Sequence, residues 1–412
     1  MTMISIEEAR ELILAHCHPL SPEDLPLPET LGRALAQPLV ADMDIPPFAN
    51  SAMDGFAIVA ADTDSVKPEH PVSLDVVDVI RAGTCGRIAV VSGTAAKIMT
   101  GAPMPEGADA VVESEFTTEA EGSVLVRRRV RSWDNVRPAG EDSSRGTEVL
   151  AAGSVIGPAE IGVLASLGLP TVRVHRKPSV AIIATGSELV EPGSPLAKGQ
   201  IYNSNAYTSE AQCRELRVEP YRMGIAPDEY DVTLAMMKNA LTHDVLITSG
   251  GVSVGDFDFV KEVQDALGVE RKLWRVAMKP GKPLSFGVYK RADGGTCLVF
   301  GVPGNPAASM VSFQLFIRPA LLRLMGHTAV ARPMSTAVLA QDEPNTEDRV
   351  RVVRVRLERE RGRVVAYSTG SQGSGRLRSM VGANALAFVS PEGGGKAAGE
   401  EVDVLIIREE AV

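Results

Sequence analysis

The residues with the clearest chemical potential lie in four short motifs, each of which follows an apolar run. Carboxylates in such positions bind hard cations or act as general bases, and lysines held in a rigid loop neutralise phosphates or other oxyanions. The set predicts chemistry on an anionic ligand. The motifs are ATGSEL with Glu188, TSGGVSVGDFD with Asp256 and Asp258, MKPGKP with Lys279 and Lys282, and GVPGNP with Asn305.

The motif TSGGVSVGDFD matches neither of the two common nucleotide fingerprints, GxGxxG and GxxxxGK[ST]. Its glycines permit unusual backbone dihedrals and expose N–H groups to an anion. One of the two aspartates is expected to cap the helix that follows, and the other is then available to a metal or as a general base. We interpret Asp258 as the functional one.

Each of the other motifs also has a structural explanation. Glu188 fits the acid that a helix dipole favours in its first turn, and Asp228 in PDEYD fits an ordinary helix start. Asn305 is fully explained as an N-cap with Pro306 as the first helical residue, although a helix start built from small residues is also an anion site. Pro280 and Pro283 fix the backbone around the two lysines of MKPGKP.

Three further clusters precede this region in the sequence. NSAMDGFA contains Asp54, MTGAPMPEGADAVV contains Thr100, and NVRPAGED contains Arg137, Glu141 and Asp142. Taken singly, each is also explained as a turn.

The elements that must position the four motifs alternate between strand and helix from Lys177 to about Met325. The apolar runs AII and VLI lack polar alternation, as strands buried in a parallel sheet do. The pattern predicts a doubly wound α/β domain. Because such sheets bind ligands outside the carboxyl ends of their strands, we expect the motif loops to meet at one edge.

The remaining chain predicts further domains, as expected for 412 residues. Residues 57–130 show short apolar runs broken by Gly, Pro and Asp, which indicates a β-rich domain. RVRVVRVRLERERGRVVAYS alternates with period two and predicts a small C-terminal β domain.

Composition narrows the class of protein. The formal charge of −10 argues against a nucleic-acid surface, and no apolar run reaches the length that spans a bilayer. The N-terminus carries acids where a signal peptide carries lysines, so we expect a cytoplasmic protein without nucleic-acid or membrane partners. Four widely separated cysteines without a CxxC pair indicate reduced thiols.

Taken together and in order, the motifs resemble those of the MoeA family, the molybdopterin molybdenumtransferases, which are similar to the E domain of gephyrin. The resemblance covers nearly the whole chain. Departures are small, with Val302 where leucine is common and Ala307–Ala308 where Val-Ser is common. The matching pieces are PPFANSAMDGFA, IMTGAPMPEGADAVV, NVRPAGED, ATGSEL, GQIYNSN, TSGGVSVGDFD, MKPGKP, GVPGNP and SGRLRSMVGANAL.

The resemblance implies a multidomain α/β protein that works as a homodimer. It implies insertion of molybdate into adenylylated molybdopterin with release of AMP and a requirement for Mg²⁺. The adenylylating enzyme and the recipient molybdoenzymes are possible further partners. The implied domains are a linker-like α+β domain at 1–45 and 145–176, an inserted β-rich domain at 46–144, a doubly wound molybdopterin-binding domain at 177–326 and a C-terminal β barrel at 327–412.

The resemblance also implies roles for individual residues, some of them supplied by the partner subunit. The residues expected to hold magnesium are Glu188, Asp228 and Asp258. Those expected to act in catalysis are Asp54, Thr100, Asp142, Glu188 and Asp258. Those expected to bind substrate are Arg137, Glu141, Gly250, Gly251, Ser253, Gly255, Lys279, Lys282, Pro303 and Pro306. The cluster around Asp54 and those at Thr100 and Arg137–Asp142 are expected to come from the second subunit.

Two rival functions fit the same motifs less well. Related domains of the doubly wound fold adenylylate molybdopterin, but the extra domains and the NSAMDGFA cluster favour metal insertion. A non-catalytic scaffold of the same fold is the other alternative, and the intact acids and lysines in every motif argue against it.

Overall fold

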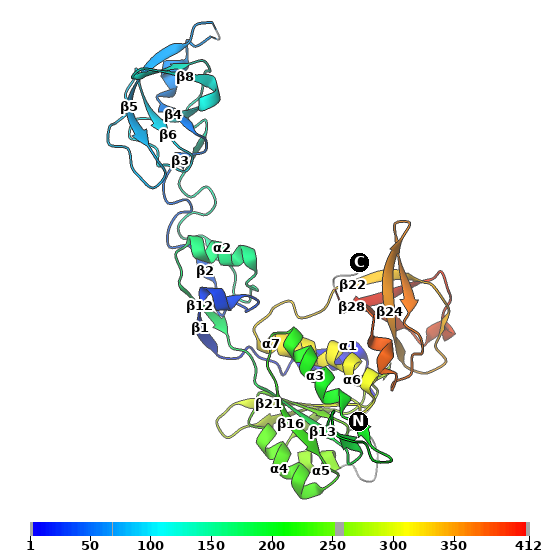
Figure 1. The fold of residues 1–412 in the computed structure, drawn as a ribbon. Coiled ribbons are helices and arrows are strands. Elements are labelled where there is room, and N and C mark those ends of the chain that lie inside the picture. The colour runs from blue at the N-terminus through cyan, green and yellow to red at the C-terminus, as the bar shows by residue number, and fades with distance from the viewer. Residues whose placement is uncertain (1–2, 68, 252–258, 409–412) are drawn as a thin grey trace. The chain divides into compact units, whose positions relative to one another are not determined.

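The computed structural model describes residues 3–67, 69–251 and 259–408 of the chain. These residues form two compact units (Figure 1). The first unit contains Met1–Glu23 and His175–Val412, and the second contains Asp24–Val174. Asp258, Asp256, Ser253 and Gly255 lie outside the described residues.

A six-stranded sheet forms the centre of the first unit, in the order β16-β13-β17-β21-β20-β18. The neighbours β16, β13, β17 and β21 run parallel to one another. Strand β20 pairs antiparallel with β21 on one side and with β18 on the other. Every residue of β17 is buried, which explains the uninterrupted apolar sequence of this strand. The strands are β13 (Val180–Thr185), β16 (Tyr221–Ala226), β17 (Val245–Ser249), β18 (Glu270–Leu273), β20 (Ser285–Lys290) and β21 (Thr296–Val302).

Helices cover both faces of this sheet, so the predicted doubly wound architecture is confirmed. One face packs against α4 (Tyr230–Ala240) and α5 (Phe259–Ala266) through a core that contains Met237 and Val263. The other packs against α1 (Ile6–Leu14), α3 (Ser204–Glu215), α6 (Pro306–Ser312) and α7 (Arg318–Leu324). A π-helical stretch, Phe313–Ile317, joins α6 to α7.

The C-terminal part of the first unit is a closed five-stranded barrel, as the sequence predicts. Its strands are β22 (Met334–Leu339), β24 (Val350–Glu360), β25 (Arg363–Ser368), β26 (Ala385–Val389) and β28 (Glu401–Ile406). Pairing runs from β24 through β25, β22, β28 and β26 back to β24. The short strand β19 (Met278–Lys279) pairs with β24, which ties the barrel to the doubly wound domain.

A charged side chain lies inside this barrel region. Arg354 on β24 is 0% exposed, and burial lowers the pKa of its guanidinium to about 10. Its Nη2 donates to the carbonyl of Gly373 at 3.2 Å and its Nε to Ser379 Oγ at 3.1 Å. The buried cation thereby fastens the chain between Gly373 and Ser379 to the barrel wall.

The second unit contains a six-stranded, mostly antiparallel sheet in the order β7-β4-β6-β5-β9-β8, so the predicted β-rich domain is also present. A smaller part holds α2 (Pro158–Ser166) with its own core around Leu164 and Ile156. The strands of the large sheet are β4 (Gly55–Ile58), β5 (Val72–Ile80), β6 (Thr94–Ile98), β7 (Ala110–Glu113), β8 (Thr117–Ala120) and β9 (Ser123–Val126). The short pairs are β1 (Pro22–Pro26) with β12 (Thr171–His175), β2 (Leu39–Val40) with β11 (Glu148–Leu150) and β3 (Asn50–Ser51) with β10 (Val136–Arg137).

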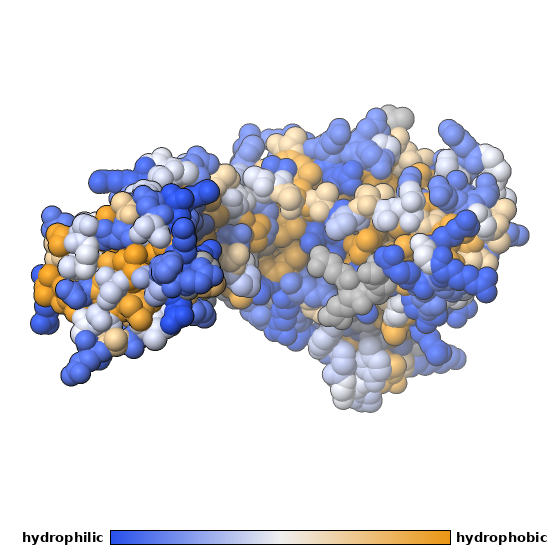
Figure 2. Space-filling view, turned by 90° about the horizontal axis from the view of Figure 1, so that it is seen from above, coloured by the Kyte–Doolittle hydropathy of each residue, from blue (hydrophilic) through white to orange (hydrophobic). Residues whose placement is uncertain are grey.

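The surface agrees with the charged composition. Hydrophilic side chains cover most of the face shown in Figure 2, and hydrophobic ones form separate patches on it. Within the ranges that the structure describes, none of the helices has the length and apolar character that crossing a membrane requires.

Candidate active site

A cleft of about 810 Å³ opens at the carboxyl ends of β13, β17 and β21. It brings together loops that the sequence placed at one sheet edge, and the barrel domain adds Gly375 to its wall. Parallel strands aligned in register explain the meeting, since Ala184, Ser249 and Val302 pair across the three strands. The predicted site residues among those that line it are Glu188, Asp228, Gly250, Gly251, Pro303 and Pro306.

Glu188 stands at the mouth of the cleft, just after β13. Its carboxylate folds over Gly186, where an added Cβ would come 2.3 Å from Glu188 Oε2. Gly186 has φ +142°, a conformation that L side chains rarely adopt. Glu188 is exposed, and the described part of the chain gives its carboxylate no hydrogen-bond or ion-pair partner.

Asp228 joins the cleft from the loop after β16. Its Oδ2 accepts from the backbone N–H of Ser187 at 3.1 Å, and the Ser187 hydroxyl accepts from the Asp228 N–H at 3.0 Å. The N-cap position of α4 belongs to Glu229, so Asp228 is not the capping residue. The reciprocal bonds place Asp228 beside the Glu188 loop, and its second oxygen accepts no hydrogen bond from the described residues.

Glycine is required where β17 ends. Gly250 and Gly251 have φ values of +91° and +70°. An added Cβ on Gly250 would lie 2.7 Å from the carbonyl of Thr185, and one on Gly251 would lie 2.2 Å from Val260 Cγ2. Gly250 therefore permits the close approach of the β13 and β17 ends, and Gly251 permits that of α5.

The GVPGNP loop differs from its prediction in one respect. Asn305 occupies the N-cap position of α6, but its side chain makes no capping hydrogen bond. Its Nδ2 donates instead to Ser374 Oγ at 3.0 Å, and the N–H of Ala307 donates to the carbonyl of Ser374 at 3.1 Å. Asn305 therefore holds the predicted N-cap position, but the explanation of its side chain as a cap is wrong. The carbonyl of Ser374, from a loop of the barrel domain, accepts from the Ala307 N–H in the first turn of α6 instead.

The two lysines of MKPGKP are exposed and are not among the described residues that line the cleft. Lys279 forms an ion pair with Glu347 of the barrel domain. Glu347 also pairs with Arg349, and the hydrogen bond from Lys279 is the largest cause of the lowered pKa of Glu347. The cation of Lys279 is thus balanced by a carboxylate that lies outside the motif.

The other predicted residues lie in the second unit. Asp54 Oδ1 accepts from the N–H and the hydroxyl of Thr100 at 2.7 and 2.8 Å, and these bonds lower the pKa of the carboxyl group. Arg137 on β10 pairs with Asn50 on β3, four residues before Asp54. All three sequence clusters thus meet, because NSAMDGFA bonds to Thr100 through Asp54 and pairs with NVRPAGED through β3 and β10.

Glu141 and Asp142 follow Arg137 in an exposed turn. The N–H of Glu141 donates to the carbonyl of Pro138 at 3.3 Å, and that of Asp142 to Ile45 at 2.9 Å. Their backbone is therefore fixed while both carboxylates face solvent.

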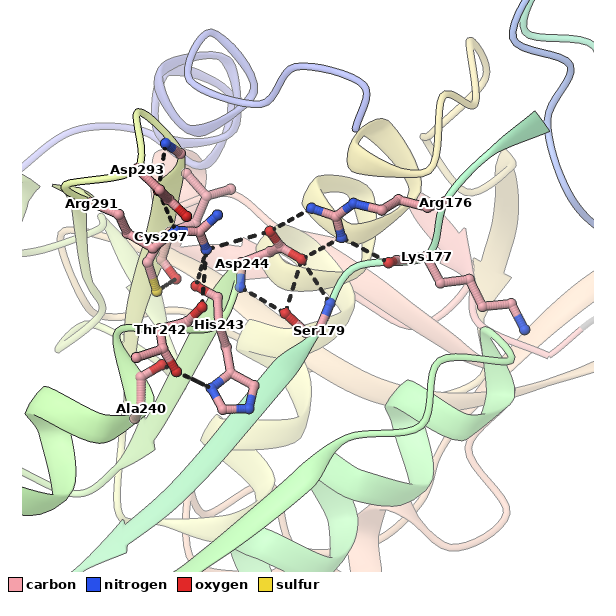
Figure 3. Close-up of polar contacts among 12 residues, drawn as sticks. Arg176, Lys177, Ser179, Ala240, Thr242, His243, Asp244, Arg291, Asp293 and Cys297 are labelled. Atoms are coloured by element: carbon pink, nitrogen blue, oxygen red, sulfur yellow. Dashed lines mark hydrogen bonds and ion pairs between the residues drawn. The ribbon is translucent and has the colours of Figure 1, made fainter. Parts of the chain in front are cut away.

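The opposite edge of the sheet holds an acidic residue that the sequence analysis did not single out (Figure 3). Asp244, at the start of β17, is 4% exposed. It accepts from Arg176 Nη1 and Nη2 at 2.7 and 2.9 Å and from the N–H and hydroxyl of Ser179 at 2.9 Å each. Arg291 Nη1 lies 3.5 Å away. We refer to Asp244 and these three partners as the Asp244 cluster.

The pKa of Asp244 reflects this environment. Burial alone raises it, but the hydrogen bonds from Arg176 and Ser179 outweigh burial and bring the pKa to about 2. Asp244 is therefore ionised and fully engaged within the fold. Among described residues, no three His, Cys, Asp or Glu side chains are grouped as a metal site.

Sequence reasoning also overlooked Tyr202 and Asn205, which line the cleft. Both belong to GQIYNSN, a stretch without the charged residues that drew attention elsewhere. The position of the stretch could have indicated these two residues, because it leads into α3 at the same sheet edge.

Comparison with known proteins gives consistent matches along the chain. Three family models match: the MoeA N-terminal region (domain I and II) at 4–168, the probable molybdopterin binding domain at 181–323 and the MoeA C-terminal region (domain IV) at 336–407. The molybdopterin molybdenumtransferase of Bacillus subtilis is 37% identical over 99% of this chain and 95% of its own length.

Other relatives agree. Molybdopterin molybdenumtransferase 2 of Mycobacterium tuberculosis is 36% identical over 98% of this chain and 99% of its own. The crystal structure of the molybdopterin biosynthesis MoeA protein from Pyrococcus horikoshii matches with a TM-score of 0.84 and 31% identity, over 99% of this chain and all of that one. With the strand-end cleft and the ordered motifs, these matches establish that the chain belongs to the MoeA family.

Proposed function

We propose that the protein is a transferase that inserts molybdenum from molybdate into adenylylated molybdopterin and releases AMP. The observation that carries the proposal is the strand-end cleft, where Glu188 and Asp228 stand beside the glycines of the β17 loop. The names of the relatives support the substrates, and the cleft offers the chemistry that a phosphate-bearing substrate needs.

Glu188 and Asp228 are proposed to hold Mg²⁺, with Asp258 as a third carboxylate. The donor set fits, because Mg²⁺ keeps several waters and commonly binds through one or two carboxylates together with substrate phosphate. When bound, the cation would neutralise charge on the phosphates and polarise the bond to AMP. The Glu188 carboxylate, which has no partner in the described structure, is suited to orient the attacking water.

Gly250, Gly251 and Gly255 are proposed to let backbone N–H groups approach the substrate phosphates, and Ser253 to donate its hydroxyl. Pro303 and Pro306 shape the neighbouring wall. Lys279 and Lys282 are proposed to attract molybdate as point charges. For Lys279 this requires the oxyanion to replace Glu347 as the partner of its ammonium group.

The residues of the second unit are proposed to act on the same substrate from a second copy of the chain. Asp54 and Thr100 form a hydrogen-bonded pair with a lowered carboxyl pKa, so an anionic oxygen would be presented at neutral pH. Arg137, Glu141 and Asp142 are exposed and available for contact, and the β3–β10 pairing joins the strand of Arg137 to the segment that leads into Asp54. A homodimer would then be required for turnover.

The proposal is tested by incubating purified protein with adenylylated molybdopterin, Mg²⁺ and molybdate. We expect AMP release that depends on molybdate and that parallels reconstitution of a cofactor-free molybdenum enzyme. AMP release that does not depend on molybdate would contradict metal insertion.

The shared site has its own test. Asp54→Ala and Glu188→Ala proteins should each be inactive, whereas a mixture allowed to exchange subunits should regain part of the activity. A mixture as inactive as its parents would contradict a site made from two subunits.

A further inference from the structure

Two residues of the cleft, Tyr202 and Asn205, take no part in the roles proposed above. Tyr202 ends the short strand β15 (Ile201–Tyr202), and Asn205 lies in the first turn of α3. Both line the cleft with the loops of Glu188 and Gly250. They are three residues apart in the chain and flank Asn203, the N-cap of α3.

Tyr202 offers the cleft a fixed aromatic ring. The residue is 43% exposed although it lines the cleft. Its strand pairs with β14 (Leu189–Val190), and its hydroxyl donates to the carbonyl of Ser194 at 3.0 Å. The N–H of Asn203 donates to Val190 at 2.9 Å, which fixes the following residue as well. An exposed aromatic ring that is held in place is a ready surface for stacking.

Asn205 offers the cleft a hydrogen-bond acceptor. The residue is 8% exposed, and its Nδ2 donates to the carbonyl of Gly304 at 2.8 Å. This bond fixes the orientation of the amide. Its Oδ1 is buried and has no hydrogen-bond partner in the described structure. A buried acceptor without a partner is unfavourable in the free protein and calls for a donor from a ligand.

We infer that Tyr202 and Asn205 recognise a planar nitrogen heterocycle of the substrate, whose face stacks on Tyr202 and whose amino group donates to Asn205 Oδ1. The inference rests on the proposed function. Adenylylated molybdopterin contains two such rings, adenine and the pterin, and both carry an amino group on the ring edge. Tyr202 and Asn205 therefore act in specificity, whereas Glu188 and Asp228 act on the phosphates.

Two pairs of ligands distinguish the rings. IMP carries a carbonyl oxygen where AMP carries its 6-amino group, and lumazine carries one where pterin carries its 2-amino group. The dissociation constant of each ligand for the full-length protein is measured by calorimetry with Mg²⁺ present. We expect the protein to prefer the amino-bearing member of one pair by about tenfold, because the other member places an acceptor against Oδ1.

Substitutions then assign the preference to the two side chains. Asn205→Leu should abolish it, whereas Asn205→Asp should keep it, since aspartate retains an acceptor. In Asn205→Asp the bond to Gly304 is lost and a carboxylate oxygen faces the Gly304 carbonyl instead. The ratio within the pair is the readout, because the added charge affects both members alike. Asn239→Leu, at an exposed position of α4, is the matched control.

For the ring, Tyr202→Ala should weaken binding of the preferred ligand about tenfold, and Tyr202→Phe should leave it within about twofold. Tyr221→Ala is the control, because Tyr221 is also an exposed tyrosine, at the start of β16, and its ring contacts His243. Thermal unfolding of each variant verifies that it folds.

Several results would overturn the inference. A wild-type protein that distinguishes neither pair by more than about twofold has no amino-group contact at Asn205. An Asn205→Asp protein that loses the preference would attribute it to the Gly304 bond instead. If one of these results is found and the wild-type protein still releases AMP in the presence of molybdate, only this inference is contradicted. The proposed function is then unaffected.

Discussion

The two edges of the doubly wound sheet carry acidic residues in opposite conditions. At the amino edge, Asp244 is buried and accepts hydrogen bonds from Arg176 and Ser179 (Figure 3). At the carboxyl edge, Asp228 accepts one backbone N–H, and the exposed Glu188 has no partner among the described residues. The same kind of side chain thus serves folding at one edge and is left for a ligand at the other.

The difference separates a carboxylate that is neutralised within the fold from carboxylates that are open to solvent. The charge of Asp244 is neutralised by groups that arrive when the chain folds, including Arg176, where the chain enters the first unit from the second. Removing it should cost stability and leave chemistry intact. Removing Glu188 should do the reverse, and the following predictions test the contrast in order of expected free energy.

Asp244→Ala should have the largest effect. Breaking a buried ion pair leaves Arg176 without its partner, so we expect the free energy of unfolding to fall by about 3–5 kcal/mol. Chemical denaturation measures this free energy. At low temperature, where the variant is folded, the rate of AMP release per folded molecule should match that of the wild type. Asp293→Ala is the control, because Asp293 pairs with the same Arg291 from an exposed position and should have a far smaller effect. Equal losses of unfolding free energy in the two variants would show that the Asp244 cluster does not stabilise the fold more than an exposed ion pair does.

Glu188→Gln should lower the rate of molybdate-dependent AMP release about 100-fold, which corresponds to about 2.7 kcal/mol. Its thermal unfolding should match that of the wild type, since no described partner is lost. Steady-state kinetics and thermal denaturation on one preparation measure both quantities. A parallel loss of stability and activity would mean that the two sheet edges do not differ as described.

Acid should weaken the Asp244 cluster within a defined pH range. The pKa of Asp244 is about 2 in the folded protein, below the ordinary value of 3.8. The contribution is therefore complete above pH 3.8 and is lost as the pH falls toward 2. Its size is about 2 kcal/mol, from the difference between the two pKa values. Urea denaturation between pH 2 and 5 measures it, and Asp244→Asn should show a smaller decrease than the wild type; equal slopes would contradict the assignment.

Gly186→Ala should have the smallest effect of the four. An added Cβ would come within 2.3 Å of Glu188 Oε2, so the Glu188 carboxylate must move. We expect AMP release to slow about tenfold, or about 1.4 kcal/mol, because a displaced catalytic group loses its alignment. Gly193→Ala is the control, since Gly193 also has positive φ but has open space around its Cβ position. Equal activity in the two variants would show that the position of Glu188 is not critical.

Much of the fold follows from sequence pattern. The uninterrupted apolar runs of β13 and β17 indicated a parallel sheet, and the alternation across Val350–Glu360 indicated a C-terminal β domain, which the family resemblance implied to be a barrel. The edge where Glu188 and Gly250 meet was predictable as well, because parallel strands place their carboxyl ends together. These features are local, or they follow from a single rule of topology.

Features that depend on distant partners were not predictable. Asp244 reads as the residue before a strand, and its partners Arg176 and Arg291 are dozens of positions away in opposite directions. Asn305 reads as a helix cap, and only the folded barrel supplies Ser374 for its side chain. In both cases the local pattern permits more than one use of the side chain, and tertiary contacts decide between them.

The buried cation of Arg354 links the barrel to the wall of the cleft. It holds Gly373 and Ser379, and the loop between them delivers Ser374 to Asn305 and Gly375 to the cleft. We therefore expect substitutions in either domain to change the affinity for substrate. Mutational scans should find substitutions in the barrel interior that change the affinity for substrate. A chimera that joins the barrel of one relative to the sheet of another should require residues at positions 305 and 374 that are compatible with each other.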